Sequence, residues 1–347
     1  MTPLTGLDDV GRQLIETIHD VLQVDEEWTS WQDDGFIWWS HRLAQRFRVD
    51  GPEEVDGVRT WWASFETSVL RNVPEGSPAV TAAIALQNRM NNLFTTKVVD
   101  GRLSHWGRAY ALPETATSRA KLVAERAIIS NALASEQAEV LSELLGRLTQ
   151  TAVEVDASAH PENGARTEPD EMLGVVRRVY SPAGSMPVGA HKMPDLNALA
   201  AMLDGPGQTT FTDERGLNLG ITGSSHGFAY GVHIDLTARH PVLGAGMLVL
   251  LSILLGDAAD VAEANEVATK LNDGELVTRR PLISFGSWSV AGKPSAAGEG
   301  GYPIRLAHAT FYPAATLNHQ VALMAAADAM QRVAWLSDAA GRVDSAS

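Results

Sequence analysis

Apolar residues recur along the chain at two spacings, one typical of helices and one typical of strands. Helical spacing behind an acidic residue occurs at 8–22 and again at 195–203, where Gly205-Pro206-Gly207 ends the second run. Further helical patterns follow at 79–93, 118–148, 257–271 and 314–335. Each half of the chain is therefore predicted to hold three helices.

Short runs rich in apolar, β-branched and aromatic residues lie between these helical patterns. Turn residues such as Asp50-Gly51-Pro52 and Gly223-Ser224-Ser225 separate the runs. The predicted strands are 35–39, 44–49, 60–70, 97–99 and 103–112 in the first half, and 216–221, 227–236, 247–254, 282–290 and 304–312 in the second. Each half has the order helix, three strands, helix, two strands, helix, with a period of about 180 residues. This order predicts an α+β protein of two similar domains, each an antiparallel sheet of about five strands flanked by helices.

A polar stretch with Pro and Gly and no apolar period separates the two patterns. It predicts a linker at 149–172 between a first domain at 1–148 and a second at 173–340, with a disordered tail at 341–347. The strand at 247–254 is apolar on both faces, so its sheet is expected to pack against more than its own helices. We therefore expect the two domains to pack as a pseudo-dimer.

Length, charge and cysteine content exclude or disfavour several classes of protein. A chain of 347 residues exceeds the size at which one core stops growing, which agrees with two domains. The net charge of −15 disfavours binding to nucleic acid or to anionic membranes. The chain has no cysteine, so disulfides and thiolate chemistry are excluded. The most apolar run, 242–255, is shorter than the ~20 residues of a membrane-spanning helix, and the N-terminal residues do not resemble a secretory leader. We expect a cytoplasmic protein.

One histidine cluster has residue types that bind metals. His233 and Asp235 are two apart on a predicted strand, so they point to one face, and His240 and His226 could complete a four-ligand set. The alternative, which we favour, is polar residues at a strand edge that face water, and we predict no metal and no cofactor. The nearby glycine-rich run 220–227 lacks the lysine of a phosphate loop and is interpreted as a hairpin turn.

Tryptophan is concentrated near the start of the chain. The doubled pairs Trp38-Trp39 and Trp61-Trp62 each place one indole on either face of a predicted strand. One face belongs to the core. The other either packs on the neighbouring domain or presents a surface to a partner, since tryptophan is favoured at interface centres. These four residues are our candidates for partner binding.

The order of elements resembles the type III secretion chaperone-like fold, including its YbjN-type branch. The resemblance is closest in the second half, at Ala264-Asn265-Glu266, Leu271-Asn272 and Phe311-Tyr312-Pro313. The first half shares Gln87-Asn88 and Asn91-Asn92 but departs elsewhere. The resemblance implies dimers or pseudo-dimers that bind protein segments, without catalysis or cofactor.

Two functional hypotheses follow. The first is a non-enzymatic protein-binding module, a chaperone or adaptor, that binds a protein partner as a monomer or a homodimer. The second is a small-molecule-binding or hydrolytic protein that uses a groove between the domains near His226, His233 and Asp235. We favour the first, because the sequence shows no converging set of catalytic side chains.

Overall fold

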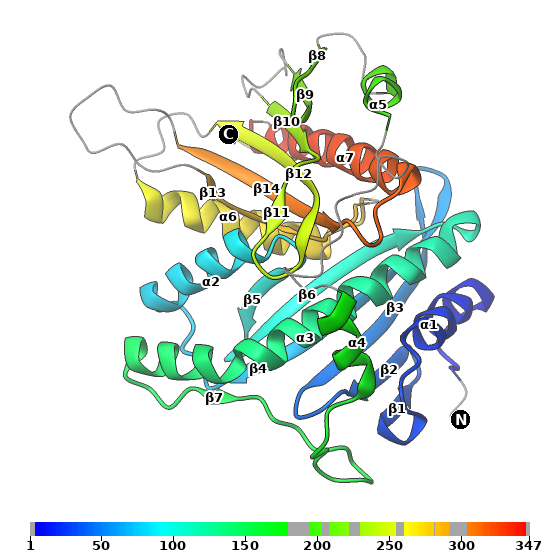
Figure 1. The fold of residues 1–347 in the computed structure, drawn as a ribbon, viewed down its shortest axis with the longest axis vertical. Coiled ribbons are helices and arrows are strands. Elements are labelled where there is room, and N and C mark those ends of the chain that lie inside the picture. The colour runs from blue at the N-terminus through cyan, green and yellow to red at the C-terminus, as the bar shows by residue number, and fades with distance from the viewer. Residues whose placement is uncertain are drawn as a thin grey trace. The chain divides into compact units, whose positions relative to one another are not determined.

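The computed structural model describes residues 4–179, 195–202, 208–221, 230–254, 260–280, 282–291 and 304–344 (Figure 1). The chain divides into two compact units. The first contains residues 1–178 together with 276–285, and the second contains 179–275 together with 286–347.

The first unit is a helix-covered antiparallel sheet. Its elements are α1 (Asp9–Leu22), β1 (Thr29–Gln32), β2 (Gly35–Trp39), β3 (Ala44–Val55), β4 (Val58–Arg71), α2 (Pro78–Asn91), β5 (Thr95–Val99), β6 (Arg102–Ala111), α3 (Ala116–Thr149), β7 (Glu154–Val155) and α4 (Glu171–Val179), with short 3-10 turns at Glu26–Trp28 and Pro113–Thr115. The strand order is β1-β2-β3-β4-β6-β5, and β7 pairs with β4. The long helix α3 packs along β4 and β6 (Figure 1).

The second unit repeats this arrangement. Its elements are α5 (Leu196–Met202), β8 (Gln208–Thr212), β9 (Gly216–Ile221), β10 (Tyr230–Asp235), β11 (Arg239–His240), β12 (Gly244–Leu254), α6 (Val261–Val277), β13 (Ser287–Ala291), β14 (Arg305–Pro313) and α7 (His319–Asp344). The strand order, β8-β9-β10-β12-β14-β13, is that of the first unit, and α7 packs on β12 and β10.

The α+β class and the two similar halves are confirmed, with one main strand more in each sheet than the sequence indicated. The additional strands are β1 and β8, which are short and mostly polar. The predicted strand 282–290 shortens to β13, and the helix predicted from Ala314 begins at His319. The pairing registers also correspond, since Thr67 opposite His105 in β4 and β6 matches Leu251 opposite His308 in β12 and β14.

Each unit has a buried asparagine on its middle helix that forms hydrogen bonds with the edge strand of its sheet. Asn88 on α2 donates to the Thr96 carbonyl at 3.1 Å and accepts from the Thr96 amide at 2.7 Å. Asn272 on α6 makes the same two bonds to Trp288, at the same two distances. Each amide side chain satisfies a donor and an acceptor of a strand backbone, which explains why asparagine is needed there.

Two segments outside the repeated pattern belong to the first unit. Within residues 149–172, predicted as a linker, β7 pairs with β4 and Arg166 binds the Trp39 carbonyl, Asp25 and Asp170. Residues 276–285 also lie in this unit. Arg108 on β6 donates to the carbonyls of Leu276 and Thr278, and its backbone forms two hydrogen bonds with Ser284. Of the predicted tail, 341–344 are helical and 345–347 lie outside the described residues.

Candidate functional site

All four candidate tryptophans are buried. Trp38, Trp39, Trp61 and Trp62 are at most 5% exposed. The indole of Trp39 donates to Ser158 Oγ at 3.0 Å, and that of Trp61 donates to Asp8 Oδ1 at 2.9 Å, beside the start of α1. These side chains pack the chain instead of forming an exposed aromatic surface. Their role in partner binding stays a prediction, and their burial gives it no support.

The histidine cluster is arranged for local hydrogen bonds. His233 Nδ1 lies 2.6 Å from Asn218 Oδ1, Asp235 accepts from the Thr237 amide, and His240 Nδ1 accepts from the amides that follow it in the turn. His226 and most of the glycine-rich run 220–227 lie outside the described residues. Among the residues that the structure does describe, no group of three His, Asp or Glu side chains is placed to hold a metal ion.

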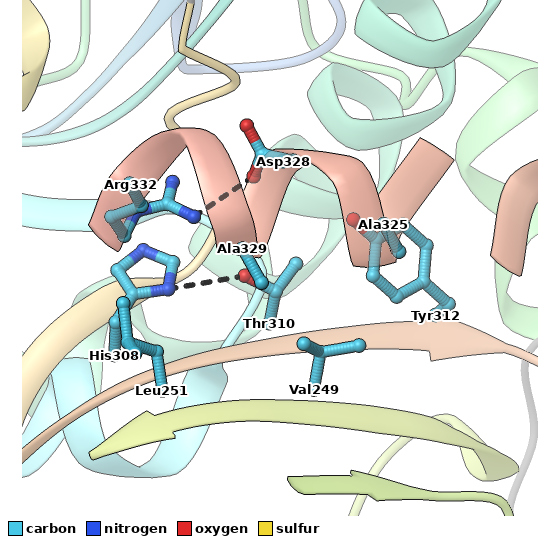
Figure 2. A pocket seen from close by; sticks show the side chains of 9 residues that line it. All are labelled: Val249, Leu251, His308, Thr310, Tyr312, Ala325, Asp328, Ala329 and Arg332. Atoms are coloured by element: carbon cyan, nitrogen blue, oxygen red, sulfur yellow. Dashed lines mark hydrogen bonds and ion pairs between the residues drawn. The ribbon is translucent and has the colours of Figure 1, made fainter. Parts of the chain in front are cut away.

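The second unit contains a buried ionic cluster with side chains from α6, β13, β14 and α7. Arg332 on α7 is 2.6 Å from Glu275 and 2.8 Å from Asp328. Glu275 also accepts from the indole of Trp288 at 2.6 Å, and His308 Nε2 lies 3.7 Å from it. Figure 2 shows Arg332 bound to Asp328, with His308 beside it on the strand below. All five side chains are almost fully buried.

Burial and neighbouring charges shift the pKa values of this cluster. Burial raises the pKa of Glu275, and the charge of Arg332 opposes that shift. Burial alone lowers the pKa of Arg332, but Asp328 and Glu275 outweigh it and raise that pKa above its ordinary value. Burial, helped by the positive charge of Arg332, lowers the pKa of His308 well below its ordinary value, so the imidazole is neutral. A buried guanidinium between two carboxylates therefore stays ionised while its histidine neighbour does not.

A small cavity adjoins the cluster. It has a volume of about 10 Å³ and is lined by His308, Thr310, Tyr312, Asp328 and Arg332 together with aliphatic side chains (Figure 2). That volume holds about one water molecule. A ligand of even a few heavy atoms does not fit, so the cluster is best understood as part of the internal framework of the second unit.

The edge strand β8 offers a different kind of site. Its burial alternates weakly, and Phe211 is 58% exposed. The Asp213 amide donates to the Gly216 carbonyl, which makes this pair the hydrogen-bonded closing pair of the β8–β9 hairpin. Because bonded pairs alternate in antiparallel strands, Thr209 and Phe211 bond to β9, whereas the N–H and C=O of Thr210 and Thr212 point to the other side.

No other strand pairs with β8 on that outer side among the described residues. Sequence reasoning missed this edge because the pattern Gln-Thr-Thr-Phe-Thr has one apolar residue. The three β-branched threonines within the five residues after Gly205-Pro206-Gly207 were the available signal.

Comparisons with known proteins identify no relative. No family model matches the chain, and neither a curated protein nor a solved structure matches it. The resemblance to the type III secretion chaperone-like fold therefore stays a prediction. Over the described residues, no helix is both long and apolar enough to span a membrane.

Proposed function

We propose that the protein is a non-enzymatic binding module, a chaperone or adaptor, that holds an extended segment of a partner protein as an additional strand beside β8. The observation that carries the proposal is the open edge of this strand, with outward backbone groups at Thr210 and Thr212 and the exposed ring of Phe211 next to them. A partner strand would satisfy these backbone groups, and main-chain hydrogen bonds are the usual source of affinity in strand addition.

The composition of β8 supports this role. Edge strands that must not pair are usually protected by proline, by lysine or by a bulge. β8 has none of these, and its register with β9 is regular over all five residues. Its three threonines and one phenylalanine favour an extended backbone, which is the conformation that strand pairing requires.

Two matched variants test the proposal. Peptides of about twelve residues are selected from a display library against the wild-type chain, and their affinity is then measured for Thr210→Pro and Thr210→Val. Proline removes the outward N–H without removing a bond to β9, so it should weaken binding at least about tenfold, the equivalent of ~1.4 kcal/mol. Valine keeps the N–H and should bind within about threefold of wild type. Peptides that bind Thr210→Pro as well as wild type, or a selection without binders, would refute the proposal.

A further inference from the structure

The second half of α3 carries a row of exposed aliphatic side chains. Val140, Leu144 and Leu148 are 67%, 37% and 53% exposed, and they recur every four residues, so they form a single row, the α3 stripe. Leu141 and Leu145 are buried in the core of the first unit, so the stripe is not the side of α3 that faces the sheet. A solvated helix face at such positions usually carries polar residues, which makes the stripe a feature to explain.

Two charges border the stripe on one side. Glu143 and Arg147 are both exposed and are four residues apart. The Arg147 Nε donates to the backbone carbonyl of Glu143, and among the described residues neither side chain belongs to an ion pair. Other charges on this half of α3 are already paired, Glu136 with Arg177 and Glu139 with Arg42.

We propose that the stripe binds a second copy of this chain, with the two α3 helices antiparallel about a two-fold axis close to Leu144. In that arrangement each Leu144 faces its counterpart, and Val140 of one copy lies against Leu148 of the other. Rows of residues four apart are the ridges through which helices most often pack. A two-fold contact uses one patch on both copies, so a single stripe is sufficient.

The bordering charges make the arrangement self-complementary. Across an antiparallel pair, side chains on the same border of each helix face one another. Arg147 of one copy then lies beside Glu143 of the other, and the symmetry creates this pair twice. The order of charges, acidic before basic, fits an antiparallel copy of the same helix and gives the proposal its specificity.

The size of the contact predicts a weak association. Three partly exposed aliphatic side chains cover much less than the ~800 Å² per partner of a stable interface. Each copy also carries a net charge of −15, so the two copies repel at long range. We expect dissociation constants on the order of micromolar or higher, with dimers favoured by salt that screens the long-range repulsion.

A charge-exchange experiment tests the proposal by sedimentation velocity on the full-length chain over a range of concentrations. Glu143→Arg alone and Arg147→Glu alone place like charges at both contacts, and each should weaken dimerisation at least about tenfold. An equimolar mixture of the two variants restores opposite charges at both contacts and should dimerise at least as well as wild type. The double variant Glu143→Arg/Arg147→Glu should also dimerise alone.

The outcomes are separable from misfolding and from the proposed strand addition. A single variant that is misfolded could not recover by mixing, so recovery in the mixture shows that both variants fold. Thr210→Pro should dimerise like wild type, because β8 lies outside the stripe. A wild-type chain that stays monomeric up to several hundred micromolar, or a mixture no better than its separate components, would overturn the proposal.

Discussion

The two units place a histidine at the same position of the same sheet and surround it differently. In the first unit, His105 Nδ1 lies 3.4 Å from Ser130 Oγ, and Ser130 contacts Thr67, which accepts from Gln45. In the second unit, His308 lies beside the ion pair of Glu275 and Arg332. The polar side chains buried around His105 are thus neutral, whereas those around His308 include charged groups. The two sheets nevertheless have the same strand order and register.

The comparison indicates which features the fold requires. The asparagine bonds at Asn88 and Asn272 occur in both units with the same geometry, whereas three residues later the first unit has Asn91 and the second has Glu275. The two units therefore have in common a strand backbone that an asparagine of the middle helix satisfies. The polar residues next to it can be neutral or ionic, provided that each finds its partners.

The outer edges of the two sheets differ in a similar way. At β1, Trp31 packs at 4.8 Å from His19 and 5.3 Å from Phe36, so the aromatic ring of this edge strand lies against its own sheet and α1. At β8, Phe211 is exposed and the strand is one residue longer. The edge strand with an exposed aromatic ring is thus in the second unit.

The largest expected effect is on the free energy of unfolding, and it should differ between the charged side chains around His308 and the neutral ones around His105. Glu275→Gln removes one of two carboxylates from a buried guanidinium, and loss of a buried ionic partner typically costs about 3–5 kcal/mol. Asn91→Ala, at the matching position, removes a neutral amide that bonds Gln87 and should cost about 1 kcal/mol. Urea unfolding of both variants measures the difference. Equal losses would show that the ionic cluster does not stabilise the second unit as described.

A smaller and symmetric effect is expected at the shared asparagines. Asn88→Ala and Asn272→Ala each remove two hydrogen bonds and leave a buried strand amide and carbonyl without their partner. Each should lower the free energy of unfolding by roughly 2–3 kcal/mol. Both changes are measured in the same urea titrations. A loss in one unit alone would contradict the equivalence of the two bonds.

A further effect depends on pH. Burial lowers the pKa of His105 to about 3, so the folded chain excludes a proton that the unfolded chain binds near pH 6.5. The stabilisation from the neutral imidazole is complete above pH 6.5 and is lost as the pH falls toward 3, at up to ~1.4 kcal/mol per pH unit. The wild-type chain should take up about one more proton on unfolding between pH 6 and 4 than the His105→Gln variant does. The free energy of unfolding of the variant should therefore fall less steeply as the pH is lowered. An unchanged slope would mean that His105 titrates normally.

Much of the architecture could be predicted from the sequence, because the long helices and central strands have strong periodic patterns. Strands 35–39 and 216–221 agree with β2 and β9 residue for residue. The edges could not be predicted, since β1 and β8 are short and mostly polar and acquire their strand form from pairing. The packing of the two domains as a pseudo-dimer stays a prediction.

The site was harder to predict than the fold. The tryptophan pairs made Trp38, Trp39, Trp61 and Trp62 candidates for partner binding, with packing on the neighbouring domain as the alternative. All four side chains are buried, as large apolar rings often are. The ionic cluster joins residues from four elements, α6, β13, β14 and α7. Of its contacts, only the one between Asp328 and Arg332 could be predicted from the sequence, because these residues are four apart on a helix.

Residue-resolved amide hydrogen exchange in β8 tests the central claim most directly. If the edge is open, the amides of Thr210 and Thr212 exchange rapidly in the free chain, those of Thr209 and Phe211 are protected by β9, and a selected peptide protects Thr210 and Thr212 as well. If Thr210 and Thr212 are already as protected as their neighbours in the free chain, the edge is covered and strand addition at β8 is contradicted.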